Sequence, residues 1–363
     1  MDFKSQFDGA GLEKRPRYSV DDALKALPIN TQELVPVQII FGFSDLDPAD
    51  TGRVREAWMK LLEDQRIIIM ERLAEGSEVD YLLDYAVFAR IGFDDPSAAV
   101  RQAAIRAGWS DESPQALERI MRLVEEDSST DVRAAAIAQV GQFIYLAEME
   151  EFDDEDAEPA RQLALDILHD PGESLEVQRR ALESVAHCSR DEVTRLIEVA
   201  YHHDDLMMRV SAVCAMGNSS DERWHDIIMD EISSNSPEIA YEAIRSAGAI
   251  GLVDSVHRIS KFGYSSDPQL QEVAVWALGE IGGDEAVDAL YAIQDYGEEQ
   301  GNDELIEAAE DALAMANMMS DLAGGLDTFG FDPDEYDGDE DYDDEDFDDG
   351  DYNEDYDDMD EES

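Results

Sequence analysis

The sequence predicts an all-α protein: an α-solenoid, that is, a superhelix of antiparallel helix pairs, followed by a disordered acidic tail. Three observations lead to this prediction. A helical phrase recurs along the chain, apolar residues between its copies have the spacing of amphipathic helices, and the composition changes abruptly after Gly325. Stacked repeats bury a continuous core that no single repeat can bury alone, so such an array predicts one extended core.

The recurring phrase starts with an apolar residue, here called the anchor, which is often followed by arginine. A small residue follows four positions after the anchor and often a glycine nine positions after it, as in Val132-Arg133, Ala136 and Gly141. The anchors are Val100, Val132, Val177, Met208, Ile239, Leu270 and Leu305. From Val177 to Leu270 they follow one another at equal intervals of 31 residues, a regularity that indicates a structural repeat.

Each repeat unit is predicted to contain two helices. Residues 221–232 place Trp224 and Ile228 on one face, which is typical of an amphipathic helix. Ser236 and Pro237 then have the order of an N-cap followed by proline in the first turn of a second helix, the helix that carries the anchor. The small residue four positions after the anchor allows close helix packing, and the glycine is expected to end the helix.

The segment Asp131-Val132-Arg133-Ala134-Ala135-Ala136 resembles the second-helix motif of HEAT-like repeats, in the short form of about 30 residues known from bilin-lyase-type repeat proteins. The resemblance covers roughly residues 94–322. It implies a solenoid of about seven to eight repeats whose second helices line a concave face. It says little about function, because this repeat serves many roles.

The domain organisation that we predict has three parts. Residues 1–50 form a partly disordered N-terminal segment and cap, 51–322 form the solenoid, and 323–363 form the disordered tail. Within the first repeat, residues 53–73 and 78–91 are expected to be two helices, and the β-branched and aromatic stretch 35–43 a short extended segment.

One repeat is longer than its neighbours. The interval from Val132 to Val177 is the longest in the array and contains the acidic run 148–158. Insertions in repeat proteins map to loops, often on a binding face, so this run is expected to be a loop, either a solvated spacer or part of a binding face.

Charge limits the possible partners. The chain has 89 acidic and 26 basic residues, a formal net charge of -63. Such a field repels nucleic acid and anionic membranes and attracts basic proteins. We therefore expect a protein partner of basic character, with no direct nucleic-acid or membrane binding. The lack of a long apolar stretch and of a signal sequence predicts a cytoplasmic protein. We expect it to be a monomer, with Cys188 and Cys214 as buried thiols.

The tail combines charge with aromatic residues. Residues 331–363 hold 21 of the acids and neither lysine nor arginine, a composition that cannot collapse into a core. The aromatic residues are evenly spread: Phe331, Tyr336, Tyr342, Phe347, Tyr352 and Tyr356. Such tails resemble those of histone chaperones, in which charge steers a basic partner and rings make contact. A solubilising tail, or one that folds back on the array, is an alternative.

Catalytic motifs are not found. The sequence has no phosphate-binding loop, no Gly-rich dinucleotide turn and no Gly-x-Ser-x-Gly motif. None of the six histidines precedes a glutamate, whereas the HEAT-like enzyme deoxyhypusine hydroxylase holds its di-iron site with His-Glu pairs. His202-His203-Asp204-Asp205 is expected to be a polar turn between helices. We predict a non-catalytic protein without metal or cofactor; a bilin-lyase-like enzyme or subunit is an alternative.

Partner-binding residues are predicted from the repeat register. If the anchor and the positions four, five and eight later face the core, the positions two and six later face outward. This register selects Arg106, Arg179, Tyr241, Arg245 and Trp276 as the partner-binding residues. Partial burial of Trp276 between neighbouring layers is the alternative for that ring. Tyrosine, tryptophan and arginine dominate interface hot spots. The predicted function is a scaffold or adaptor that binds a protein on its concave face, because the sequence contains a repeat array and no catalytic motif. A chaperone-like or DNA-mimicking protein that captures basic proteins with its tail is the alternative.

The arginine that follows an anchor has a structural explanation instead. Arg101, Arg133 and Arg209 recur at this position. We expect each to pair with an acidic residue of the neighbouring repeat, because a charge that recurs along a stack is best placed between its layers.

Overall fold

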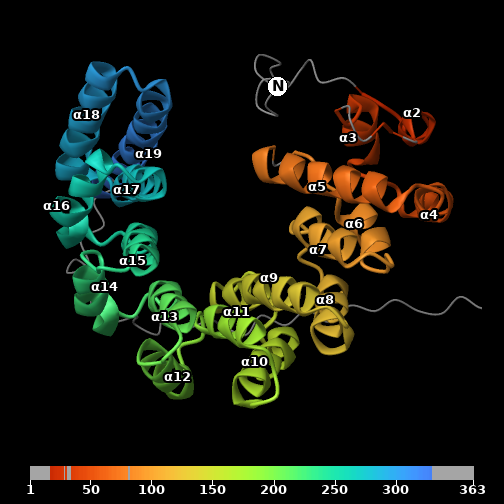
Figure 1. Ribbon diagram of the computed structural model, residues 1–363, viewed down its shortest axis with the longest axis horizontal. Coiled ribbons are helices and arrows are strands. Elements are labelled where there is room, and N and C mark those ends of the chain that lie inside the picture. The colour runs from red at the N-terminus through yellow and green to blue at the C-terminus, as the bar shows by residue number, and fades with distance from the viewer. Residues whose placement is uncertain (1–16, 28, 31–33, 81, 329–363) are drawn as a thin grey trace, which may run out of the picture. The chain divides into compact units, whose positions relative to one another are not determined.

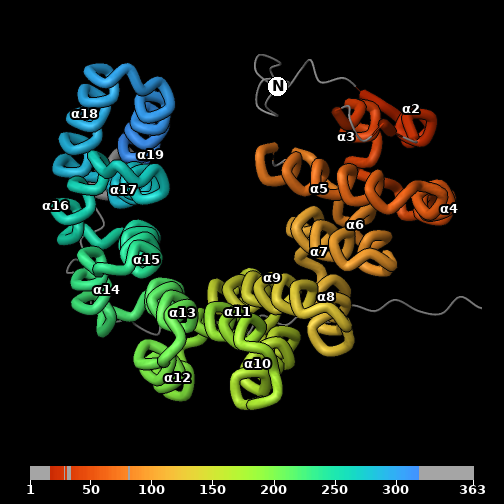
Figure 2. Tube along the Cα trace, viewed as in Figure 1, coloured from red at the N-terminus to blue at the C-terminus, as the bar shows by residue number. Residues whose placement is uncertain are grey.

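A computed structural model describes residues 17–27, 29–30, 34–80 and 82–328, with side chains as far as residue 318. The chain divides into two compact units, Met1–Met319 and Ser320–Ser363. The described residues form helices and connecting turns without a strand (Figures 1 and 2). The predicted all-α class is thereby confirmed.

Two short helices, α2 (Val20–Ala26) and α3 (Val37–Phe43), precede eight helix pairs in the described part. The first helices of the pairs are α4 (Thr51–Trp58), α6 (Ala86–Gly92), α8 (Pro114–Glu126), α10 (Asp154–His169), α12 (Asp191–Tyr201), α14 (His225–Glu231), α16 (Val256–Ile259) and α18 (Gly283–Gln300). The second helices are α5 (Glu63–Val79), α7 (Ala98–Ala107), α9 (Thr130–Glu148), α11 (Leu175–Val185), α13 (Leu206–Asn218), α15 (Pro237–Ala249), α17 (Pro268–Ile281) and α19 (Asp303–Thr328). Short 3-10 turns precede α4 and α14 and lie on both sides of α16.

The second helices pack against one another in chain order. Contacts join α5 to α7 and continue through α9, α11, α13 and α15 to α17, and each first helix from α8 to α14 also packs on the second helix that follows it (Figure 1). Every anchor lies in a second helix. The predicted α-solenoid of HEAT-like helix pairs is therefore confirmed. We call the continuous series α5 to α17 the second-helix row.

Some helix starts follow the predicted capping chemistry. Proline stands in the first turn of α8, α15 and α17. The Ser113 hydroxyl accepts a hydrogen bond from the Ala116 N–H, and the Asp267 carboxylate accepts one from the Gln269 N–H at 3.0 Å. Ser236 stands at the N-cap of α15, but its hydroxyl donates to the Glu238 carboxylate instead.

The recurring glycines do not end helices, and that prediction is wrong. Gly217, Gly248 and Gly279 lie in the last turns of α13, α15 and α17, still within the helix and without the positive φ of a glycine stop. Each instead faces a small residue of the next second helix: a methyl group on Gly248 would lie 2.8 Å from the Cα of Ala277. The facing residue is always seven positions after the next anchor: Ser184 for Gly141, Ser246 for Gly217, Ala277 for Gly248 and Ala312 for Gly279. The glycines set the distance between neighbouring helices.

The stretch 35–43 is helical, not extended. It forms α3 after Pro36, and a methyl group on Gly42 would lie 2.8 Å from the Cβ of Ala23 in α2. Close packing against α2 thus overrides the strand preference of its β-branched residues. The two helices expected at 53–73 and 78–91 are also wrong, because non-helical residues at 59–62 and at 82–85 separate α4, α5 and α6.

The acidic run 148–158 forms a loop only at residues 149–153, so the loop is shorter than expected. Helix α9 continues to Glu148, and α10 begins at Asp154. The guanidinium of Arg161, whose side chain is 2% exposed, lies 3.1 Å from the Glu148 carboxylate and 2.6 Å from that of Asp154. Since a buried arginine needs anionic partners, the run supplies the counter-charge for Arg161 and joins α9 to α10.

The last helix is longer than expected. Helix α19 passes through Gly324 and Gly325 and reaches Thr328, because glycine weakens a helix by about 1 kcal/mol without removing a hydrogen bond. The predicted tail aromatic residues, Phe331 to Tyr356, lie outside the described residues.

Arginines after the anchors join repeats in part of the array. Arg101 donates two hydrogen bonds to Asp127, at 2.6 and 2.7 Å, and Arg133 donates one to Glu173 at 2.8 Å. Both acids precede the next second helix, as predicted. For Arg209 the prediction is wrong: it donates to the carbonyl oxygens of His203 and Asp204 in its own repeat.

Candidate functional site

Three of the predicted residues line one hollow on the second-helix row. Tyr241 and Arg245 lie on α15 and Trp276 lies on α17, and together with Glu272 and Val273 they surround a hollow of about 340 Å³. Tyr241 is 38% exposed and Trp276 is 39% exposed. These fractions place two large rings where a partner can reach them, with Val273 buried beneath.

A second hollow of about 560 Å³ adjoins the same tyrosine. Its lining comes from α13, α15, α17 and the turn before α17: Met207, Val210, Pro237, Glu238, Tyr241, Glu242, Asp267, Gln269 and Leu270. Tyr241 lines both hollows, so they belong to one surface. We call this surface the Tyr241 hollows.

Arg245, Glu242 and Cys214 form a cluster of polar side chains at this surface. The guanidinium of Arg245 lies 2.6 Å from the Glu242 carboxylate and 3.2 Å from the Cys214 Sγ. Burial alone would lower the pKa of Arg245, but Glu242 and Cys214 outweigh burial and raise it. Burial raises the pKa of the Cys214 thiol, so Cys214 stays protonated and unreactive. The charge of Arg245 is thus already neutralised by Glu242.

The remaining charges around the hollows are negative. Glu272 is exposed and has no hydrogen bond or ion pair with any described residue. Glu238 is also exposed, and a hydrogen bond from the Ser236 hydroxyl lowers its pKa. Asp267 caps α17 and faces the larger hollow. Exposed rings beside unpaired carboxylates favour a cationic group, which can lie on a ring face and pair with an acid.

Arg106 and Arg179 do not belong to this surface. Arg106 lies on α7 with its side chain 49% exposed and its guanidinium 3.9 Å from the Glu78 carboxylate. Arg179 was expected to face outward but is only 7% exposed, so that expectation is wrong. Its guanidinium donates to the Met207 carbonyl at 2.9 Å and to the Ser211 hydroxyl at 3.0 Å, because α13 packs over it.

The register rule could have found one residue that the prediction left out. Glu272 lies two positions after its anchor, as Tyr241 does, and so shares the outward position. Met207 and Asp267 precede their anchors and lie at the start of a helix. No periodic signal in the sequence identifies them, because they enter the site through the stacking of neighbouring repeats.

Within the described chain no three His, Cys, Asp or Glu side chains come together as a metal-binding group. The His202–Asp205 segment is the turn between α12 and α13, where His203 Nδ1 accepts the Asp205 N–H at 3.0 Å. Among the described helices none is both long and apolar enough to cross a bilayer.

Comparisons with known proteins concern the fold alone. No protein-family model matches the chain, and no curated protein matches it. The complex of CpcE and CpcF of phycocyanin lyase from Nostoc sp. PCC7120 is 14% identical, with a TM-score of 0.48, over 79% of this chain and 98% of that chain. Human deoxyhypusine hydroxylase is 16% identical, with a TM-score of 0.34, over 75% and 97%. Importin beta is 13% identical, with a TM-score of 0.38, over 77% and 44%.

Proposed function

We propose that this protein is a non-catalytic scaffold that binds a basic segment of a partner protein at the Tyr241 hollows. The observation that carries the proposal is that two exposed rings, Tyr241 and Trp276, lie beside the carboxylates of Glu238 and Glu272 on one surface of α13, α15 and α17. Partner binding uses few anchor residues, and tyrosine and tryptophan are enriched among them.

The chemistry of the surface selects the partner. Lysine and arginine side chains of a partner would lie on the rings of Tyr241 and Trp276 and pair with Glu272 and Glu238. The net charge of -63 would speed their approach and make it dependent on salt. An acidic partner would meet repulsion at every exposed carboxylate. A basic, exposed segment is therefore the partner that fits.

The test is a titration of the full chain with a fluorescein-labelled oligo-arginine peptide, followed by fluorescence anisotropy. Replacing both rings, with Tyr241→Ala and Trp276→Ala, should weaken binding by at least about tenfold. Tyr291→Ala is the matched control, because Tyr291 is 52% exposed on α18, outside the hollows. Equal loss in the control and the double variant would contradict the proposal.

A second candidate function places the contact in the tail. Its support is the composition of residues 331–363, which combine 21 acids with regularly spaced rings. In that case serine at all six tail aromatic positions should weaken binding of the oligo-arginine peptide, and the Tyr241→Ala, Trp276→Ala variant should bind it normally. The two candidates thus predict opposite responses to the same two variants.

A further inference from the structure

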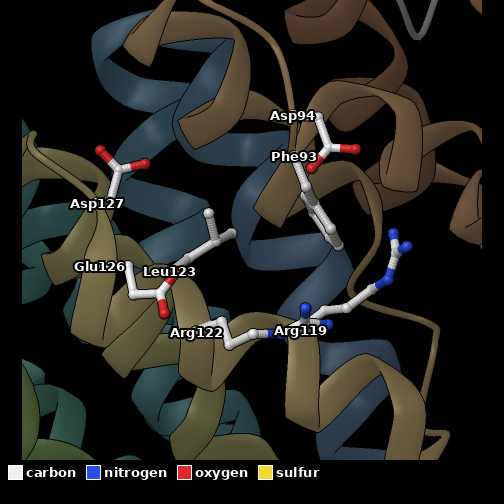
Figure 3. A pocket seen from close by; sticks show the side chains of 7 residues that line it. All are labelled: Phe93, Asp94, Arg119, Arg122, Leu123, Glu126 and Asp127. Carbon is white, nitrogen blue, oxygen red and sulfur yellow. The ribbon is translucent and has the colours of Figure 1, made fainter.

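Two arginines on α8 lie free beside a separate hollow. Arg119 and Arg122 are three residues apart and therefore share a face of the helix. With Phe93 and Leu123 they line a hollow of about 230 Å³ (Figure 3), which Asp94, Glu126 and Asp127 complete. Figure 3 shows Arg119 and Arg122 at the end of the hollow away from Asp127.

Arginines without an acidic partner are unexpected in this chain, because it has 89 acidic residues and only 26 basic ones. Neither Arg119 nor Arg122 makes an ion pair or hydrogen bond to any residue in the described ranges. The other arginines between Arg53 and Arg258 all make at least one; Arg106 lies 3.9 Å from the Glu78 carboxylate, and Arg195 donates to the Asp191 carbonyl. The fold brings acids close to these two guanidiniums without pairing them.

The nearby acids already have other partners. The Asp94 carboxylate pairs with Arg55. Asp127 accepts two hydrogen bonds from Arg101 and one from the Ser129 N–H at 2.8 Å. Only Glu126, at the rim, is an acid of the lining without such a partner among the described residues. Two positive charges therefore face the hollow against one uncommitted negative charge.

We infer that this hollow binds a phosphate monoester, held by the paired guanidiniums of Arg119 and Arg122. A carboxylate has two oxygens and one negative charge, which one arginine side chain can pair with. A phosphate monoester has three acceptor oxygens and a charge of about -1.5 to -2, so it can accept hydrogen bonds from two guanidiniums at once. Phe93 and Leu123 give the carbon skeleton next to the phosphate an apolar wall. The phosphate belongs either to a free phosphorylated metabolite or to a phosphorylated side chain.

This site is independent of the Tyr241 hollows. It lies on a first helix and the turn after α6, not on α13, α15 and α17, and it selects the opposite charge. Glu126 would oppose anion binding at the rim, and the acidic field of the chain adds to that opposition. The site should therefore select dianions, which gain most from two guanidiniums.

The test is isothermal titration of the full chain at low ionic strength with acetyl-Ala-phosphoserine-Ala-amide. The Glu analogue of this peptide and inorganic phosphate are titrated alongside. We expect the phosphopeptide to bind at least about tenfold more tightly than the Glu analogue. Arg119→Gln with Arg122→Gln should remove this binding, and Glu126→Gln should strengthen it by about threefold or more. The matched control Arg195→Gln should leave it unchanged.

Each outcome decides something. Phosphopeptide binding that survives in Arg119→Gln with Arg122→Gln, or equal binding of the Glu analogue, would overturn the assignment. Binding of inorganic phosphate as tight as the peptide supports a free phosphorylated metabolite as the source, and a clear preference for the peptide supports a phosphorylated partner. Circular dichroism of the variants checks that the helices are intact, which the exposed and half-buried positions of Arg122 and Arg119 favour.

Discussion

The second-helix row is joined in two different ways along its length. From α5 to α11, arginines reach across to a carboxylate before the next second helix: Arg66 to Asp95, Arg101 to Asp127 and Arg133 to Glu173. A glycine lies against a small residue of the next second helix from α13 to α19, as at Gly217 and Ser246, and also between α9 and α11, where Gly141 meets Ser184 beside the Arg133 pair. One sequence phrase thus supports two kinds of joint.

The glycine contacts do not require repeats of equal length. They occur across intervals of 31 residues at Gly217 and Gly248, of 45 residues at Gly141 and of 35 residues at Gly279, and the 31-residue interval from Val177 to Met208 has no such glycine. Backbones in close contact permit only one register, because a shift would place a larger side chain in the gap. The comparison teaches that a glycine contact fixes where two neighbouring second helices meet, whereas the number of residues between them can vary.

The largest expected effect is at the first charged joint. Asp95 is 2% exposed and accepts hydrogen bonds from Arg66 at 2.8 Å and from Trp58 Nε1 at 2.9 Å. Asp95→Ala would leave the buried Arg66 without its counter-charge, so the free energy of unfolding should fall by about 3–5 kcal/mol. Urea unfolding followed by circular dichroism measures this loss.

The control for that variant is its neighbour. Asp94 pairs with Arg55, but its side chain is 61% exposed, so Asp94→Ala should change the unfolding free energy by no more than about 1 kcal/mol. Similar losses for Asp94→Ala and Asp95→Ala would show that burial does not distinguish the charged joints.

The next effect is at a glycine joint. In Gly248→Ala, the added methyl group would lie 2.8 Å from the Cα of Ala277 and 3.0 Å from the ring of Trp276. Overpacking of this kind costs about 1–3 kcal/mol, and the displaced ring should also weaken binding of the oligo-arginine peptide. Gly52→Ala is the control, because nothing lies within 4 Å of a methyl group there. A Gly248→Ala variant as stable as Gly52→Ala would contradict the close-contact account.

The sequence predicted the repeat and the helix pairs that carry the anchors, because apolar periodicity and a recurring interval are signals of the chain itself, but it did not predict the bounds of α4, α5 and α6. It also placed Tyr241 and Trp276 outward, and both lie exposed. It placed Arg179 outward as well, but α13 covers that side chain. Whether a periodic position is open depends on the neighbouring repeat, and the period does not contain that information.

For a related reason, the role of the recurring glycines as contact points between helices was not predicted from the sequence. A glycine near a helix end has two possible roles, a helix stop or a close contact, and a single repeat does not distinguish them. The distinction lies between repeats: each glycine faces a serine or alanine seven positions after the next anchor. This second periodicity was present in the sequence and could have been found by comparing positions across successive units.

A third prediction concerns pH, which should affect the charged joints alone. Burial would raise the pKa of Asp127, but hydrogen bonds from Arg101 and the Ser129 N–H outweigh it and lower the pKa. The pKa of Glu173 is lowered in the same way, with Arg133 outweighing burial. A folded-state pKa below the unfolded one contributes stability above the unfolded value, about 3.9 for Asp and 4.3 for Glu, and that contribution is lost as pH falls through the folded pKa.

The measurement is urea unfolding between pH 7 and pH 3 for the wild type and for Asp127→Asn with Glu173→Gln. We expect the variant to be less stable by about 1–3 kcal/mol at pH 7 and the difference to shrink below about pH 4. A difference that stays constant down to pH 3 would mean that these carboxylates do not act through their charge.

The smallest expected effect compares the same repeat position in the two regions. Arg133 donates to the Glu173 carboxylate, whereas Arg209 donates only to the carbonyl oxygens of His203 and Asp204 in its own repeat. Arg209→Gln should therefore cost no more than about 1 kcal/mol, the usual net value of a hydrogen bond, and Arg133→Gln about 1.5–3 kcal/mol, because its bond joins two charges. Added salt should reduce the cost of Arg133→Gln and leave that of Arg209→Gln unchanged. If Arg133→Gln and Arg209→Gln lowered the unfolding free energy equally, and with the same dependence on salt, the charged contact between repeats would be worth no more than a hydrogen bond within one repeat.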